Sequence, residues 1–139
     1  MSLKIKKGKN PVKNLLNKVL IVNEDQNVAS SLSMVLDNMG FDSLTVKSEK
    51  EATLLLEKSL PKAMLLNYWR NLDFLKGVHS ILRSEKTPPP LILIGTLPVE
   101  ELQSVSRSMG GAAVLRAPFN LDDFENCIQN CLSPNKILH

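Results

Sequence analysis

Glycine is scarce in this chain, with six residues in 139, and none follows the first apolar run, where the sequence reads NEDQNVASS. A dinucleotide site needs glycines at that point so that the backbone can approach a pyrophosphate, and a P-loop needs them for the same reason. No GxSxG segment is present to place a nucleophile on a sharp strand-to-helix turn. These absences disfavour the common cofactor-dependent enzymes of α/β architecture, so we expect neither a cofactor nor an enzymatic activity.

Cysteine and histidine are also rare, with two residues of each. Cys127 and Cys131 are four positions apart in a helical pattern, whereas His79 and His139 are isolated in the sequence. A zinc site needs three or four such ligands close together. We therefore predict no metal site and interpret the two cysteines as small, buried apolar side chains on one face of a helix.

No acidic residue occurs among the first thirteen positions, although five lysines do: Lys4, Lys6, Lys7, Lys9 and Lys13. Without them, 12 of the 17 basic residues remain against 14 acidic ones, a balance of −2 for the rest of the chain. We interpret residues 1–17 as a basic tail or linker. A negative folded part argues against nucleic acid as a partner.

Long apolar runs are absent as well, because no uninterrupted stretch approaches the roughly 18 to 20 residues that a membrane helix requires. The apolar segment after the lysines is interrupted by Lys18 and two asparagines, unlike a secretory signal. We therefore expect a cytoplasmic protein without a membrane partner.

Five short apolar runs recur every 20 to 28 residues. Several are continuous rather than alternating, as parallel strands buried on both faces require. The runs are VLIV (19–22), SLTV (43–46), AMLL (63–66), LILI (91–94) and AAVL (112–115).

Segments of helical period separate these runs. Ser48 and Glu51 form a capping-box pattern at the start of the second helix. Pro98 is placed at the start of the fourth helix, and Asn120 is placed at the start of the fifth. The predicted apolar stripes are Val28, Leu32, Val35 or Leu36 and Met39; Leu54, Leu55 and Leu56; Leu75, Val78, Ile81 and Leu82; and Phe124, Ile128 and Leu132.

A strand followed by a helix, repeated five times, predicts an α/β fold with right-handed crossovers and helices on both faces of a parallel sheet. We expect a single flavodoxin-like, doubly wound (βα)5 three-layer sandwich with strand order 2-1-3-4-5 over residues 18–132, followed by a C-terminal tail at 133–139. Ligands of such folds meet the loops at the carboxyl ends of the strands. Those loops are Asn23–Asp25, Asn67–Asn71, Gly95 with Thr96, and Arg116–Pro118.

The segments KVLIVNED, AMLLN, PPLILIGT and GGAAVLRAPFN resemble the receiver domains of two-component response regulators. The resemblance covers about residues 18–132. It implies a CheY-like fold, a role in phosphorelay signalling, and a cis bond between Ala117 and Pro118.

The positions that carry the chemistry of that family are altered here. The family holds Mg²⁺ with an acidic pair and an acceptor aspartate, and it adds a hydroxyl residue and a lysine. The corresponding residues are Asn23 and Glu24 for the pair, Asn67 for the acceptor, Gly95 with Thr96 beside it for the hydroxyl, and Ala117 for the lysine.

An amide at the acceptor position changes the expected chemistry. The side chain of Asn67 is neutral and nearly unreactive, whereas a carboxylate is a nucleophile. Glu24 between two amides is at most a weak Mg²⁺ ligand, because the ion prefers carboxylates and waters in octahedral geometry. We therefore expect a degenerate phosphoacceptor pocket that folds without an ion.

Our leading hypothesis is a pseudo-receiver that binds a protein partner of a signalling pathway without accepting phosphate. Trp69 leans over the pocket, faces a partner, or covers the end of the core together with Tyr68. Arg116 either reaches back to Glu24 or stays solvated. In the resembling family the fourth helix, fifth strand and fifth helix commonly form dimers or partner contacts. Here that face would use residues 98–132, including Arg107, Arg116 and Asp123, and could support a homodimer.

Two alternatives stay open from the sequence. In the first, Glu24 or Asp25 replaces the lost acceptor in a working phosphotransfer protein. In the second, the strand ends bind a small anion through backbone N–H groups and Arg70 or Arg116.

Overall fold

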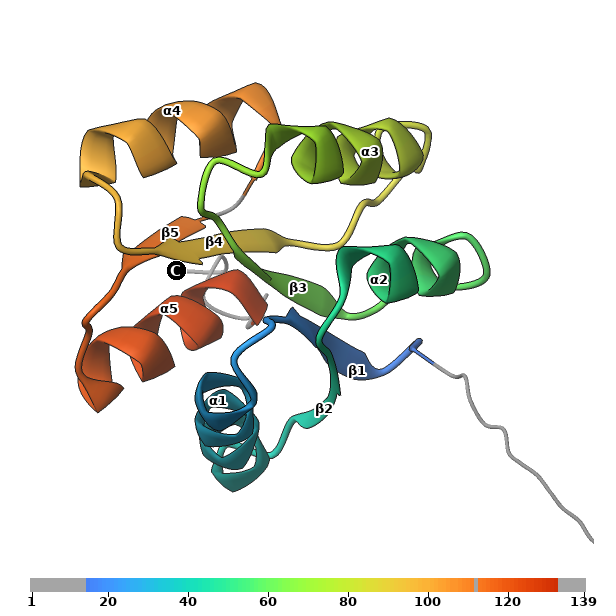
Figure 1. The fold of residues 1–139 in the computed structure, drawn as a ribbon. Helices are drawn as coiled ribbons and strands as arrows, with labels where there is room; N and C mark the ends of the chain where they lie inside the picture. The colour runs from blue at the N-terminus through green and yellow to red at the C-terminus, as the bar shows by residue number, and fades with distance from the viewer. Residues whose placement is uncertain (1–14, 112, 133–139) are drawn as a thin grey trace, which may run out of the picture.

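In the computed structural model, which describes residues 15–111 and 113–132, strands and helices alternate along the chain (Figure 1). The strands are β1 (Lys18–Val22), β2 (Asp42–Val46), β3 (Ala63–Asn67), β4 (Leu91–Gly95) and β5 (Ala113–Arg116). The helices are α1 (Gln26–Asn38), α2 (Glu49–Leu56), α3 (Leu72–Leu82), α4 (Val99–Ser108) and α5 (Leu121–Leu132).

The five strands form one parallel sheet in the order β2-β1-β3-β4-β5, which confirms the predicted fold. The central strand β3 pairs Met64 with Leu20 on one side and with Leu91 on the other. Its first four residues are buried, as expected of a strand covered on both faces. The bond between Ala117 and Pro118 is cis, as the resemblance implied.

Side chains on the two faces of the sheet contribute to two separate cores, because successive residues of a strand point in opposite directions. In β1, Leu20 joins the core beneath α2, α3 and α4, whereas Ile21 joins the core beneath α1 and α5. Figure 1 shows this three-layer arrangement, with α2, α3 and α4 on one side of the sheet and α1 and α5 on the other.

Local capping positions the helices where the sequence predicted them. The Ser48 hydroxyl accepts from the backbone N–H of Glu51 at 3.0 Å, and the Asn120 side chain accepts from the N–H of Asp123 at 2.7 Å. Each bond satisfies a donor that the first turn of a helix leaves unpaired.

Two details of the predicted stripes are wrong. Val28 is 39% exposed, and its neighbour Ala29 is buried in its place, next to the correctly predicted Leu32 and Leu36. Leu54 is 52% exposed, because α2 turns Ala52 and Leu56 toward the core.

The chain already enters the core before β1, since Leu15 is fully buried although the predicted tail spans residues 1–17. Residues 1–14 of that tail, the segment 133–139 and position 112 lie outside the described residues. Among the described helices, none is long and apolar enough to cross a membrane.

Candidate functional site

A pocket of about 250 Å³ opens at the carboxyl ends of β1, β2 and β3. Its lining residues are Val22, Asn23, Glu24, Lys47, Ser48, Glu49, Asn67 and Trp69. The structure thus brings together three of the predicted pocket residues and Trp69. The β2 end, Lys47 to Glu49, was missed, although the predicted strand order already placed it beside the end of β1.

The loop after β1 has most of its polar groups paired. Asn23 is 7% exposed, and its Oδ1 accepts from the N–H of Asp25 at 2.9 Å. The Asp25 carboxylate caps α1 by accepting from the N–H groups of Asn27 and Val28 at 3.0 and 3.2 Å. The helix N-terminus stabilises this negative charge, so Asp25 has a structural partner while Glu24 stays exposed.

The loop after β3 is organised by Asn71, a buried amide. Its Oδ1 accepts from the N–H of Trp69 at 2.9 Å, and its Nδ2 donates to the carbonyl of Asn67 at 3.2 Å and to Oε2 of Glu49 at 2.6 Å. Sequence reasoning placed Asn71 in the loop but assigned it no role. Its signal was an amide directly before the first turn of α3, where side chains commonly bond to nearby backbone.

The two aromatic residues after Asn67 have opposite environments. Tyr68 is 3% exposed and belongs to the core, whereas Trp69 is 55% exposed and lines the pocket. Only Tyr68 therefore covers the end of the core, and Trp69 presents an aromatic ring beside the pocket.

Gly95, at the end of β4, lies where no side chain fits. A Cβ built on it would be 2.6 Å from the carbonyl oxygen of Tyr68, a separation that real Cβ atoms essentially never show. The N–H of Tyr68 donates to the carbonyl of Ile94 at 2.7 Å, which holds the loop after β3 against this strand. A side chain at this position would require the loop after β3 to shift.

The remaining predicted pocket residues do not line this cavity. Thr96 is exposed, and Ala117 donates its backbone N–H to the carbonyl of Gly95 at 2.7 Å. The predicted six-residue pocket is therefore divided, with Asn23, Glu24 and Asn67 around the cavity and Gly95, Thr96 and Ala117 outside its lining.

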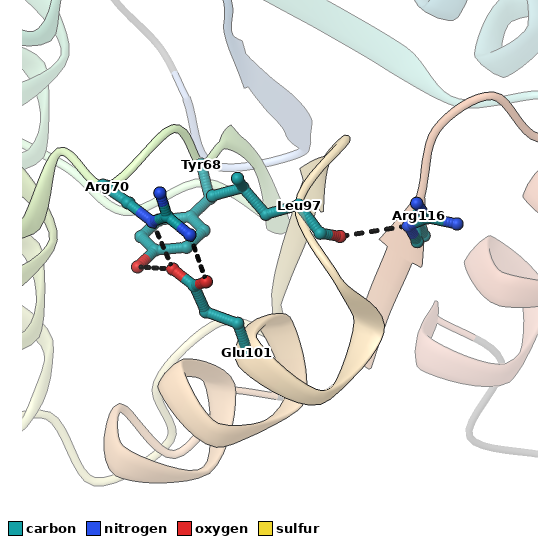
Figure 2. A network of polar contacts seen from close by, with 5 residues as sticks. All are labelled: Tyr68, Arg70, Leu97, Glu101 and Arg116. Atoms are coloured by element: carbon teal, nitrogen blue, oxygen red, sulfur yellow. Dashed lines mark hydrogen bonds and ion pairs between the residues drawn. The ribbon is translucent and has the colours of Figure 1, made fainter.

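Glu101 on α4 joins the loop after β3 to the helix, as Figure 2 shows. Arg70 donates from Nε and Nη2 to the two carboxylate oxygens at 2.9 and 2.8 Å, and the Tyr68 hydroxyl donates to Oε2 at 3.1 Å. Arg70 adopts a left-handed backbone conformation with φ +75°, which is uncommon for a residue other than glycine. Sequence reasoning missed this network, because Arg70 and Glu101 are 31 positions apart.

The network changes the ionisation of its members. The hydrogen bonds from Arg70 hold the pKa of Glu101 below its ordinary value. Burial raises the pKa of Tyr68, and its hydrogen bond to Glu101 raises it further.

The idea that Arg116 reaches back to Glu24 is wrong. Its Nε donates instead to the carbonyl of Leu97 at 3.1 Å, and the residue stays exposed at the end of β5 (Figure 2). Arg107 on α4 and Asp123 on α5 are also exposed.

The donor set does not fit the Mg²⁺ of the receiver family. Within residues 15–111 and 113–132, no three His, Cys, Asp or Glu side chains are grouped so as to hold a metal ion. Among the described lining residues, two are carboxylates: Glu49 already accepts from Asn71, and Glu24 shares the pocket with the amides Asn23 and Asn67. A hard dication would find mostly neutral oxygens here.

Response regulators are among the solved structures with a similar fold. The receiver protein from Burkholderia phymatum is 22% identical, with 82% of this chain and 93% of that chain covered and a TM-score of 0.70. A response regulator from Thermotoga maritima is 20% identical over 86% and 99%, with a TM-score of 0.74. The signal receiver domain from Bermanella marisrubri is 24% identical over 85% and 99%, with a TM-score of 0.70. The chain therefore has the fold of a receiver domain.

A comparison with protein-family models assigns the chain to a more specific family. Residues 18–133 match the family described as the flagellar regulatory protein FleQ. The chain belongs to the FleQ family. None of the curated proteins matches it closely enough to count as a relative.

Proposed function

We propose that this chain is a cytoplasmic, receiver-like regulatory domain that acts through contacts with protein partners and accepts no phosphoryl group. The observation that carries the proposal is Asn67, an amide at the end of β3 where receiver domains carry the acceptor aspartate. An amide nitrogen and carbonyl provide no carboxylate nucleophile for phosphoryl transfer.

The electrostatics of the pocket support this role. Two carboxylates about 4 Å apart repel by roughly 4 kcal/mol at an effective dielectric constant near 20, so an intact receiver pocket relies on a cation. Asn23 and Asn67 replace two such charges with amides. The pocket then needs neither Mg²⁺ nor the lysine that Ala117 replaces.

The two alternative functions have less support. Asp25 is engaged at the N-terminus of α1, which disfavours it as a substitute acceptor. Arg70 is paired with Glu101, and Arg116 donates to Leu97, so neither guanidinium is poised over an anion site at the pocket.

Phosphorylation is tested directly by incubating the reduced chain with Mg²⁺ and a small-molecule phosphodonor and measuring intact mass, with a conventional receiver domain in parallel as a positive control. We expect no adduct of about 80 Da on the native chain. The Asn67→Asp variant separates the effect of the amide from that of the missing lysine, because it restores only the acceptor. An acid-labile adduct on Glu24 or Asp25 of the native chain would overturn the proposal.

Partner binding would use the outer surface of α4, β5 and α5, where Arg107, Arg116 and Asp123 are exposed. If two copies pair through this face, light scattering should give a dimer mass that is lost in Arg107→Glu. A dimer that survives this charge reversal would place the contact elsewhere, for example at Trp69.

A further inference from the structure

The only two cysteines of the chain, Cys127 and Cys131, lie near the end of α5, away from the pocket described above. Both are free and half-buried, and both pack against the core beneath α1 and α5. Residues four apart on a helix lie one above the other on the same face, so the two thiols are neighbours.

Both thiols line a second cavity, of about 720 Å³, between α5, β5 and the proline-rich loop before β4. Pro88 to Pro90 form one wall, and Val114 and Leu115 of β5 contribute another. Among the described residues that line it, Asp123 carries the one charged side chain. Both half-buried cysteines therefore border a space that a small molecule could enter.

The two thiols affect each other's ionisation. The hydrogen bond from Cys127 lowers the pKa of Cys131 to about 7, although burial opposes the shift. The same hydrogen bond, followed by burial, raises the pKa of Cys127. The carboxyl end of a helix disfavours a nearby anion, so the Cys131 thiolate depends on the neighbouring S–H donor.

We propose that Cys127 and Cys131 form a dithiol site that reacts with low-molecular-weight disulfides, with Cys131 as the attacking thiol and Cys127 as the resolving thiol. The juxtaposition of the pair on one helix face beside an open cavity carries this inference, which is independent of the proposed function.

The reaction is a balanced thiol–disulfide exchange. The Cys131 thiolate attacks one sulfur of a disulfide R–S–S–R, forms a mixed disulfide and releases one thiolate RS⁻. Cys127 then loses its proton and attacks the Cys131 sulfur, which releases the second RS⁻. The protein is oxidised to an internal disulfide, and the small disulfide is reduced to two thiols.

Closure of the internal disulfide must disturb the end of α5. Side chains four apart on a helix have Cβ atoms about 5 to 6 Å apart, whereas a disulfide needs roughly 3.5 to 4.5 Å. Cys131 is one residue from the end of α5, where few helical hydrogen bonds resist unwinding. A bond formed under such strain is readily reduced, so the oxidation is reversible.

The test uses the full chain, reduced and then exposed to oxidised glutathione at neutral pH, with intact mass and free-thiol counts taken over time. We expect the native chain to lose both thiols and to retain no glutathione. Cys127→Ser should stop at one glutathione on Cys131, and Cys131→Ser should react about tenfold more slowly. Hydrogen exchange should show loss of protection in the last turn of α5 of the oxidised native chain only.

The two single variants are matched controls, because each keeps one thiol and a hydroxyl of similar size in place of the other. Repeating the reaction in urea should make their rates equal, which ties any difference to the fold. Equal rates in the folded variants, or a native chain that accumulates two glutathiones, would overturn the proposal.

Discussion

The two halves of the sheet's carboxyl edge differ in how accessible they are. Around β1, β2 and β3, Glu24 and Lys47 are exposed around an open pocket with Trp69 at its side. On the β4 side, the loop after β3 lies against the edge of the sheet, where Tyr68 bonds to Ile94 and Arg70 bonds to Glu101 of α4. One half is accessible, and the other is internally closed.

The comparison shows which contacts hold each half of the receiver fold. In the closed half, the Tyr68 carbonyl occupies the space above Gly95, and the Tyr68 hydroxyl anchors to α4 through Glu101. These contacts connect the loop after β3 to α4 without a phosphoryl group. In the open half, the pocket is lined by two amides, Asn23 and Asn67.

Replacement of the two adjacent aromatic residues, one at a time, should give the largest difference in stability between the two halves. Tyr68→Ala removes a buried ring from the closed half and should lower the free energy of unfolding by about 3 to 5 kcal/mol. Trp69→Ala, in the open half, should cost less than about 1 kcal/mol, because its ring is largely in solvent. Urea unfolding followed by circular dichroism measures both free energies. Equal losses of stability would contradict the distinction between the open and the closed half.

A hydroxyl residue at the end of β4 should be poorly tolerated. Gly95→Thr places a Cβ against the Tyr68 carbonyl and should lower the free energy of unfolding by about 3 kcal/mol. The matched control is Gly77→Thr on α3, where a Cβ meets nothing within 4 Å and stability should change by less than about 0.5 kcal/mol. Similar denaturation midpoints for the two variants would show that the loop after β3 can move aside.

The loop beside the open pocket should depend on one amide. Asn71→Ala leaves the Trp69 N–H without its acceptor and should lower the free energy of unfolding by about 2 kcal/mol. Trp69 is the only tryptophan of the chain, so its fluorescence reports a loosened loop directly. Asn126→Ala on the exposed side of α5 is the control and should change neither quantity.

The smallest effect concerns the ion pair of the closed half and depends on pH. Because Arg70 lowers the pKa of Glu101 below 4.5, the stabilisation is fully present above that pH and is lost as the pH falls through the lowered value. The stability difference between the native chain and Glu101→Gln should therefore vanish in acid. Glu100→Gln, on the exposed face of α4, should show no such pH dependence.

The elements of the fold were largely predictable because their signals are local. The strand AMLL is continuously apolar and bounded by polar residues, so burial on both faces follows from the sequence. The stripe of α1 was harder to predict, because Val28 and Ala29 are both apolar and only packing against the sheet selects Ala29.

The candidate site was predictable only where strand order alone brings residues together. Asn23 directly follows β1, and Asn67 ends β3. Because these two strands are neighbours in the sheet, the strand order alone places both residues at one pocket. The bonds of Asn71 to Glu49 and of Arg70 to Glu101 join separate loops and helices. Their partners depend on loop conformation, which residue spacing does not specify.

The sequence by itself determined the succession of strands and helices, because burial periodicity and helix caps act over a few residues. It also determined that position 67 carries an amide, which provides no carboxylate nucleophile in any fold. Only the tertiary structure decided that Gly95 must lack a side chain and that Trp69 faces solvent. Both depend on how closely two distant backbone segments approach, which is set by packing of the whole sheet.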